Sequence, residues 1–400
     1  MNIPLKYVAH ISAGQSPPSA QVSDLTNGLA FLQGNAEFKA LHPAPRLECD
    51  TAPKKALKGD ILVSVRAPVG ALNIADRPYG IGRGLCAIRA QRCDERFLWW
   101  WMHAQRHQLD AVSTGTTYRA VTAEDLEHLS FPALSMASQR RIARFLDTET
   151  ARIDHVAELR RMQRNLLTSR RWSHFQEILD AAAGPVIPLR RVVRSIIDGP
   201  FGSAFSSTDY VDEGAAVVRL GNIGFSEYRS IDQARIPMSL YQQFQYHQVL
   251  SGDVLIAGLG DARNHAGRAC VAPDLGPAIV KGKCFRARME PETADAEFIA
   301  LLLSSPVGAS AIEGRGSTRS MINLEIVKAA LLPIPELRAQ RSVVTEHRKS
   351  WKRTKAAINA CDLQLGLLSE RRQALITAAV TGQFDVSTAS GRNVTEGVPA

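Results

Sequence analysis

The chain repeats itself once, about 200 residues apart, and this repeat constrains the fold more than any other feature. Residue pairs that lie 201 positions apart are Asp94 and Asp295, Phe97 and Phe298, Gly115 and Gly316, Gln139 and Gln340, and Arg171 and Arg372. Further upstream the offset shrinks, since Gly59-Asp60 matches Gly252-Asp253 at 193 and Pro4 matches Pro188 at 184. A repeat of this length is too long for a solenoid unit, so it indicates two tandem domains.

Each copy begins with a segment rich in glycine and proline, residues 1–136 and 184–335. Short aliphatic runs in these segments, such as Ile61–Val65 and Val254–Ile256, follow Lys-Gly-Asp or Ser-Gly-Asp, a turn signal followed by a strand. A helix is expected from Arg96 to Leu109. We predict an α+β domain with a mixed or antiparallel sheet in each copy.

Each copy ends in a segment almost free of glycine and proline, which predicts one long helix over 137–183 and another over 336–383. Such helices would be about 65–70 Å long. A seam with steps of three and four residues marks the second helix: Val344, His347, Trp351, Thr354, Ile358, Cys361, Leu365, Leu368, Arg372, Leu375 and Ala379. The best seam of the first helix is Leu146, Ile153, Val156 and Leu167. Such seams favour an antiparallel coiled coil between the two helices, with 384–400 as a flexible tail.

The composition points to an acidic partner. The net charge of +9, concentrated on the two helical segments, favours nucleic acid first and an anionic membrane surface second. No apolar run is long enough to cross a bilayer, and the first ten residues lack a signal-peptide pattern. The six cysteines show no zinc-ligand spacing, so we expect reduced thiols in a cytoplasmic protein.

Sequence motifs of enzymes that act on DNA are missing. The chain contains no P-loop, no Asn-Pro-Pro-aromatic or Asp-Pro-Pro-aromatic tetrapeptide, and no strand followed by F-x-G-x-G. His103 and His107 stand four residues apart, but an amphipathic packed helix explains this spacing better than a metal site. We therefore expect a binding protein with no catalytic residues, no metal ligands and no cofactor of its own.

The architecture and three motifs resemble the specificity (S) subunit of type I restriction–modification systems. The motifs are Pro132 with Gln139–Asp147 and Glu149–Asp154, the C-terminal segment Leu368–Gln383, and the segment Asp198–Ser203. The segment Pro335–Gln340 departs from the family pattern at the entry to the second helix. The resemblance covers essentially the whole chain. It implies two similar target-recognition domains that alternate with two long helices.

The resemblance also implies partners. Each recognition domain would read one half of an asymmetric, bipartite site in double-stranded DNA, and the helices would set the spacer and dock the methyltransferase subunits. Two copies of an adenine-N6 methyltransferase subunit and two copies of a translocating endonuclease subunit would complete the complex. S-adenosylmethionine, ATP and magnesium would belong to those partners, and no membrane would be involved. Because methylation flips an adenine out of the duplex, the catalytic subunit needs a separate reader to place it.

Candidate DNA-contacting residues are polar or basic and lie in loops that recur in both copies. In the first domain they are Asn35, Arg66, Tyr79, Arg83, Thr116, Thr117, Tyr118 and Arg119; in the second they are Asn222, Arg263, Asn264, His265, Lys281, Lys283, Ser317, Thr318 and Arg319. Turn formation and maintenance of the fold explain any single one of these residues about as well. The bases that they would read do not follow from the sequence.

Other functions remain open at this level. One is an orphan DNA-binding specificity factor that acts without the nuclease subunit. Another is a fragment of a fused methyltransferase or nuclease, which the missing motifs disfavour. A coiled-coil scaffold without a DNA role would leave the two glycine-rich domains unexplained.

Overall fold

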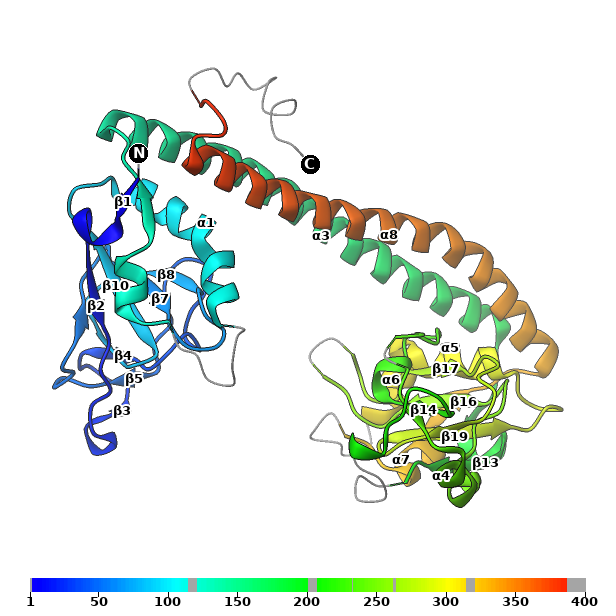
Figure 1. Cartoon of the computed structure of the whole chain (residues 1–400). Coiled ribbons are helices and arrows are strands. Elements are labelled where there is room, and N and C mark those ends of the chain that lie inside the picture. The colour runs from blue at the N-terminus through cyan, green and yellow to red at the C-terminus, as the bar shows by residue number, and fades with distance from the viewer. Residues whose placement is uncertain are drawn as a thin grey trace. The chain divides into compact units, whose positions relative to one another are not determined.

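A computed structural model of the chain describes residues 2–113, 121–200, 207–231, 233–261, 264–313 and 321–386. The chain divides into two compact units. The first unit contains Met1–Arg161 and Asp362–Ala400, and the second contains Met162–Cys361. Each unit holds one globular domain and a part of both long helices (Figure 1). The units therefore cut through the helical segments that the sequence suggested as separate elements.

The globular domain of the first unit is built on two sheets. An antiparallel sheet has the strand order β2 (Ala9–Ala13), β10 (Leu85–Ala90), β7 (Ile61–Ser64), β8 (Leu72–Ile74). A smaller mixed sheet has the order β3 (Ser23–Asp24), β5 (Leu47–Glu48), β4 (Ala30–Leu32), β9 (Tyr79–Ile81), β6 (Lys55–Ala56), in which β4 and β9 are parallel. A two-stranded sheet pairs β1 (Asn2–Pro4) with β11 (Ser130–Pro132).

The second unit repeats this plan. Its antiparallel sheet has the order β13 (Val193–Asp198), β19 (Cys284–Met289), β16 (Val254–Ala257), β17 (Ala269–Val271). Its smaller sheet has the order β15 (Arg235–Ile236), β14 (Ala215–Val218), β18 (Ala278–Val280), again with one parallel pair, β14 and β18. Strands β12 (Val186–Pro188) and β20 (Leu331–Pro333) correspond to β1 and β11. Both strands predicted after a Gly-Asp turn are present as β7 and β16.

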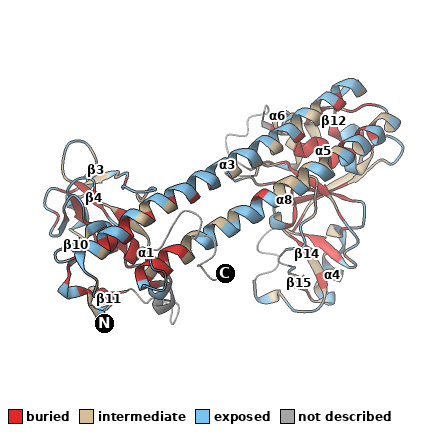
Figure 2. Ribbon diagram, turned by 90° about the horizontal axis from the view of Figure 1, so that it is seen from above, coloured by how far each residue is buried: buried red, intermediate tan, exposed pale blue. Residues whose placement is uncertain are grey.

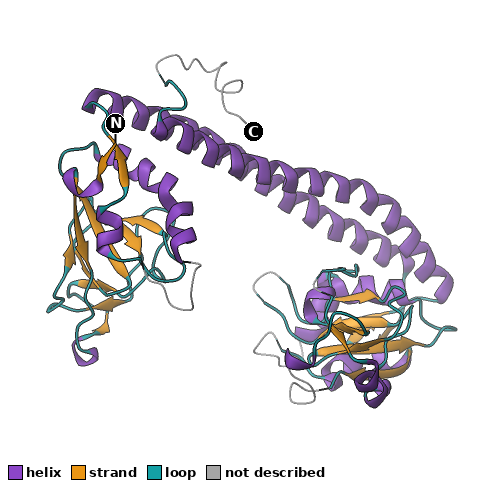
Figure 3. Ribbon diagram, in the orientation of Figure 1, coloured by secondary structure: helices purple, strands orange, loops and turns teal. Residues whose placement is uncertain are grey.

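Helices flank the sheets in both units (Figure 3). The first unit has α1 (Glu95–Ser113) and α2 (Ala123–Glu127), and the second has α4 (Met238–Gln243), α5 (Ala296–Ser304), α6 (Pro306–Glu313) and α7 (Leu324–Ala329). The two long helices are α3 (Met136–Ala182) and α8 (Leu337–Thr381). The whole is an α+β fold, as the sequence indicated.

The long helices pack against each other in antiparallel direction inside each unit. In the first unit Arg372 of α8 is paired with Asp154 of α3 at 3.0 Å. In the second unit the Arg171 Nε of α3 lies 3.4 Å from the His347 Nε2 of α8. The predicted α8 seam is confirmed, because every one of its positions is buried or half-buried.

The predicted α3 seam is wrong at Val156, which is 41% exposed. The buried positions there are instead Leu146, Thr150, Ile153 and Ala157, which follow steps of four, three and four residues. The sequence did not reveal this seam because threonine and alanine carry little apolar side chain, while valine does.

The repeated glutamine joins each long helix to the domain before it. Gln139 of α3 accepts a hydrogen bond from the backbone of Asp94 at 2.8 Å, and Gln340 of α8 does the same for Asp295. Both glutamine side chains also donate to nearby backbone carbonyls. Since both are buried, the 201-residue spacing records a structural joint that each copy retains.

Apolar side chains of the globular domains and of both helices form the cores. The main core of the first unit contains Phe97, Trp101 and Phe131 with Leu146 and Leu375 from the long helices. That of the second contains Phe298, Leu302 and Leu332 with Phe175 and Val343. All six cysteines are free and buried, as expected of core thiols, and burial raises the pKa of Cys284 to about 12.

Candidate nucleic-acid interface

Several predicted DNA-contacting loops meet at one edge of the first globular domain. The backbone N–H of Val65 donates to the carbonyl of Gly84 at 3.0 Å. This bond joins the loop after β7 to the loop before β10, so Arg66 and Arg83 lie on adjacent loops. Both arginines are exposed.

A third loop, after β4, reaches the same edge. Gly82 donates to the carbonyl of Leu32 at 2.8 Å, and a Cβ on Gly84 would stand 2.8 Å from the Gln33 carbonyl. Only glycine allows the two backbones to approach this closely. Asn35 follows in this loop and is half-buried. Three polar candidates, Asn35, Arg66 and Arg83, are thus brought together from distant parts of the sequence.

A fourth loop ends beside them. The N–H of Val121 donates to the carbonyl of Val65 at 3.1 Å. The candidates just before it, Thr116, Thr117, Tyr118 and Arg119, lie outside the described residues.

The second globular domain repeats this hydrogen-bond arrangement. Gly258 donates to the Lys283 carbonyl at 2.7 Å, and Ile322 donates to the Gly258 carbonyl at 2.9 Å. Lys283 therefore corresponds to Gly84 of the first domain, and Lys281 and Lys283 flank Gly282, the counterpart of Arg83. The candidates Arg263, Ser317, Thr318 and Arg319 lie outside the described residues.

Lys281 belongs to a cationic and aromatic group that the sequence did not reveal. Its Nζ donates to the Tyr210 hydroxyl at 2.8 Å and lies 4.9 Å from the centre of the Tyr210 ring. The guanidinium of Arg219 lies 5.8 Å from the same ring. Tyr210 and Arg219 stand about 60–70 positions before Lys281, and no local motif links them.

Two further candidates of the second domain, Asn264 and His265, contact other groups than Lys281 does. Asn264 is half-buried, and its side-chain amide donates to both carboxylate oxygens of Asp261 at 3.0 Å. His265 is half-buried, with its Nε2 3.2 Å from the Leu303 carbonyl and its ring 5.2 Å from that of Phe225.

Tyr79 and Asn222 are buried, at odds with the prediction that they contact DNA. The Tyr79 hydroxyl donates to Asp76, and burial together with this bond raises the pKa of Tyr79 to about 12. The Asn222 amide donates to the carbonyls of Arg229 and Ile231, and its oxygen accepts from the Arg219 N–H. The polar groups of both side chains form hydrogen bonds within the domain, so these residues maintain the fold, which is the alternative that the sequence had left open.

The middle of the long helices forms a second surface of interest. Much of the ribbon of both helices is coloured as exposed there (Figure 2), and large apolar residues are among the exposed ones. In the first unit they are Val156 (41% exposed) and Leu159 (51%) on α3, and Leu363 (67%) and Leu367 (54%) on α8. Exposed apolar groups of this size concentrated on one structural element are typical of a protein interaction surface.

The described residues hold neither a metal-binding cluster nor a membrane-spanning helix. No group of three or more His, Cys, Asp or Glu in those ranges is arranged to hold a metal ion. Likewise, no described helix is long and apolar enough to cross a membrane. His103, on the side of α1 that packs beside Trp99, has its pKa lowered to about 4 by burial and by nearby Arg372 and Arg106.

Comparisons with known proteins agree with this arrangement. Residues 41–160 match the type I restriction modification DNA specificity domain. A type I restriction enzyme MjaX specificity subunit of Methanocaldococcus jannaschii is 35% identical over 156 residues, which cover 38% of this chain and 36% of the relative. A type I specificity subunit of Mycoplasma pneumoniae is 27% identical over 113 residues, or 27% of this chain and 30% of the relative. The chain thus spans about a third of the length of the curated relatives it matches.

A solved structure extends the similarity to the whole fold. A chain from work on complex assembly and conformational transition of the type I R-M system aligns over 96% of this chain and 98% of its own length, with a TM-score of 0.65 and 19% identity. At this identity the likeness concerns the fold. Together these matches confirm the resemblance to a type I specificity subunit.

Proposed function

We propose that this chain is the DNA-recognition subunit of a type I restriction–modification complex. The observation that carries the proposal is the repeated loop edge: the same two backbone hydrogen bonds assemble it in both globular domains, yet different side chains occupy it. Arg66 and Arg83 stand at this edge in one domain, and Lys281 and Lys283 in the other. Two readers with a shared frame and different contacts suit an asymmetric, bipartite DNA site.

In this proposal the long helices determine the length of unread DNA between the half-sites. Helices α3 and α8 have 47 and 45 residues, which corresponds to about 70 Å each. The exposed apolar residues of their middle parts would be covered by two methyltransferase subunits, and two endonuclease subunits would complete the assembly. S-adenosylmethionine, ATP and magnesium would be bound by those partners, and this chain would bind no cofactor.

Methylome sequencing of host cells with and without this gene tests the main claim. The expected result is a bipartite adenine-methylated motif that disappears with the gene. Arg66→Ala should relax one base position in one half-site, with a loss of about 1–3 kcal/mol in discrimination if Arg66 reads a base. Arg194→Ala, a change of an exposed arginine on β13 away from this edge, is the control. A motif that persists without the gene would contradict the proposal.

An insertion tests the role of the helices. Four residues inserted after Glu158 lengthen α3 by about 6 Å and rotate the helix by little more than one turn, so the seam largely survives. The unread gap should then grow by about one or two base pairs at 3.4 Å each. Two inserted residues should instead turn the seam away and destabilise the helical pair. An unchanged gap after the four-residue insertion would show that the helices do not measure the DNA.

The docking surface can be tested separately. Leu159→Lys combined with Leu367→Lys should abolish co-purification of the methyltransferase subunit, because two charges would enter an apolar contact. Ser369→Lys, which adds a charge at an exposed position on another face of α8, should have little effect. Equal retention of the subunit by both variants would exclude this surface.

A further inference from the structure

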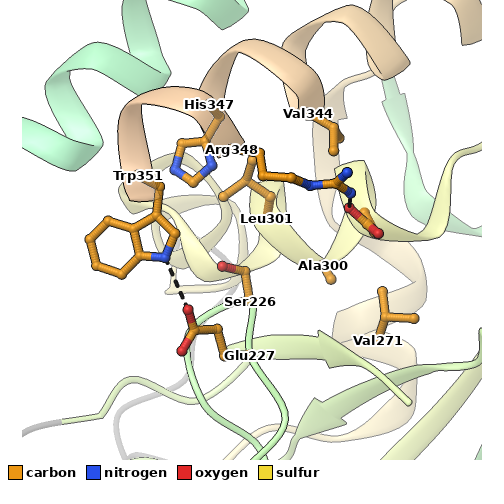
Figure 4. A pocket seen from close by; sticks show the side chains of 10 residues that line it. Ser226, Glu227, Val271, Ala300, Leu301, Val344, His347, Arg348 and Trp351 are labelled. Atoms are coloured by element: carbon orange, nitrogen blue, oxygen red, sulfur yellow. Dashed lines mark hydrogen bonds and ion pairs between the residues drawn. The ribbon is translucent and has the colours of Figure 1, made fainter. Parts of the chain in front are cut away.

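In the second unit the globular domain contacts α8 through polar side chains around a cavity of about 280 Å³ (Figure 4). Arg348 of α8 forms an ion pair with Glu297 of α5. Trp351 of α8 donates its indole N–H to Glu227 of the domain at 3.0 Å. Glu227 also accepts from Lys355 at 2.8 Å. The domain thus presents carboxylates, and the helix presents cations and an indole donor.

In the first unit these roles are reversed. Arg96 of α1 forms an ion pair with Asp147 of α3. Trp100, also of α1, donates its indole N–H to Asp147 at 2.8 Å. Here the domain presents the cation and the indole donor, and the helix presents the carboxylate.

The ion pairs occupy corresponding positions of the repeat. Arg96 and Glu297 are 201 residues apart, and so are Asp147 and Arg348. The same geometric contact has therefore exchanged its charges between the two copies. The tryptophan–carboxylate bonds are not at matching positions, since Trp351 corresponds to Thr150, so they are an independent instance of the same exchange.

A repeated arginine lies near a tryptophan in each unit, although the two tryptophans come from different elements, Trp351 from α8 and Trp100 from α1. The repeated arginines Arg171 and Arg372 both lie near an indole face, Arg171 at 3.8 Å from the Trp351 ring centre and Arg372 at 5.7 Å from that of Trp100. Arg171 belongs to α3, the helix that follows the first domain, but lies in the second unit. Arg372 belongs to α8, the helix that follows the second domain, but lies in the first unit. The charge exchange is thus confined to the contact between a domain and the helix that follows it.

We propose that the exchanged charges make each globular domain compatible with its own helix and incompatible with the other. A first domain on α8 would oppose Arg96 to Arg348, and a second domain on α3 would oppose Glu297 to Asp147. Like charges repel where the native pair attracts. The two domains share one fold and could otherwise dock on either helix, so these residues fix which domain follows which helix. This holds whether or not the domains read DNA.

A charge cycle in the full chain tests the proposal, because it transfers the ion pair of the first unit into the second. Glu297→Arg places the residue of the first domain against Arg348, and Arg348→Asp places the residue of α3 against Glu297. The double variant recreates the pair of the first unit and has the same net charge as the native chain. Hydrogen exchange of the α5 amides reports local opening of the interface.

Each single variant should raise α5 exchange about fivefold, a modest change because both native side chains are partly exposed, and the double variant should return it to within about twofold of the native rate. Glu297→Gln should fall between native and Glu297→Arg, which separates loss of attraction from repulsion. Glu325→Arg on α7 makes the same charge change away from this interface and should leave α5 unaffected. Unchanged exchange in both singles, or a double variant that remains as fast as the singles, would overturn the proposal.

Discussion

The two units share a backbone arrangement and differ in the side chains that complete it. Matching hydrogen bonds join Val121 to Val65 in the first unit and Ile322 to Gly258 in the second. By contrast, Arg268 of the second unit corresponds to Ala71 of the first. The Arg268 carbonyl accepts from the Ala257 N–H, and the Ala71 carbonyl accepts from the Ser64 N–H, which is the matching bond of the first sheet. The shared backbone frame therefore accommodates a longer second domain where new side chains supply hydrogen bonds to its loops.

Arg268 shows how this is achieved. Its buried guanidinium donates to the carbonyls of Ile223, Leu259, His265 and Leu220 at 2.9–3.2 Å. Burial lowers the pKa of Arg268 from its usual value, the cost of placing a cation where backbone oxygens are its hydrogen-bond partners. The loops around β17 depend on this one side chain, while the first unit has no such need at Ala71.

The largest difference between the units should appear on removal of this arginine. Arg268→Ala removes the guanidinium from four carbonyls, of which that of Leu220 still accepts from the Ile223 N–H at 3.3 Å, and should lower the free energy of unfolding of the second unit by about 3 kcal/mol. Urea unfolding followed by hydrogen exchange in each unit measures this, and the first unit should keep its native protection. Equal loss in both units would contradict the comparison.

Acid should act on both units through different elements. Burial, with a smaller effect of Arg171 and His174, lowers the pKa of His347 to about 4. Since an unfolded histidine has a pKa of about 6.5, the unfolded chain takes up a proton that the folded chain refuses. The free energy of unfolding should therefore fall as the pH drops from about 6.5 to 4, by about 3 kcal/mol in total.

His347→Phe should remove this loss from the second unit only. His103 of α1, whose pKa is also lowered to about 4, should continue to destabilise the first unit in acid. Unfolding followed by hydrogen exchange between pH 4 and 7 separates the two units. An unchanged pH dependence of the second unit in this variant would rule out His347 as its source.

The repeated glutamines should have similar effects, because each accepts from an aspartate N–H, although Gln340 donates to two carbonyls and Gln139 to one. Gln139→Ala and Gln340→Ala each leave buried backbone groups without a partner and should cost about 2 kcal/mol in the corresponding unit. Gln364→Ala, at an exposed position of α8, is the control. A clearly larger effect of one variant would show that the joint has diverged between the copies.

The smallest effect should come from the indole donors. Trp351→Phe removes the bond to Glu227 but leaves Glu227 paired with Lys355, so the second unit should lose about 1 kcal/mol. Trp100→Phe should cost somewhat more, since Trp100 is buried and the smaller ring leaves space. Thermal unfolding of both variants measures the difference. A greater loss for Trp351→Phe would reverse the order expected from burial.

Much of the fold could be predicted from sequence periodicity and spacing. The α+β class, both long helices and the strands after Gly59-Asp60 and Gly252-Asp253 follow from patterns that act over a few residues. The seam of α8 was readable because Leu368, Leu375 and Cys361 are apolar at regular steps. The division into units was not readable, because it depends on which part of α8 returns to the first domain.

The candidate interface was only partly readable for the same reason. Proximity of Arg66, Arg83 and Asn35 depends on strand pairing between distant segments, and Tyr210 and Arg219 join Lys281 without a local signal. Burial separates Tyr79 and Asn222 from the exposed candidates, and polar residue type alone does not reveal burial. The charge exchange at Glu297 and Arg348 was not found from the repeat, because aligning the two copies picks out identical residues and not residues of opposite charge.

The first unit is completed by Asp362–Ala400, a segment that is synthesised after the whole of the second unit. The second unit, Met162–Cys361, is continuous and can assemble before synthesis ends. Until then, the surface of the first domain that packs against Leu375, Ile376 and Val380 is exposed to solvent. A product that stops short of α8 would display this apolar surface permanently and would be a ready substrate for chaperones and proteases. The order of completion is thus the reverse of the order of translation.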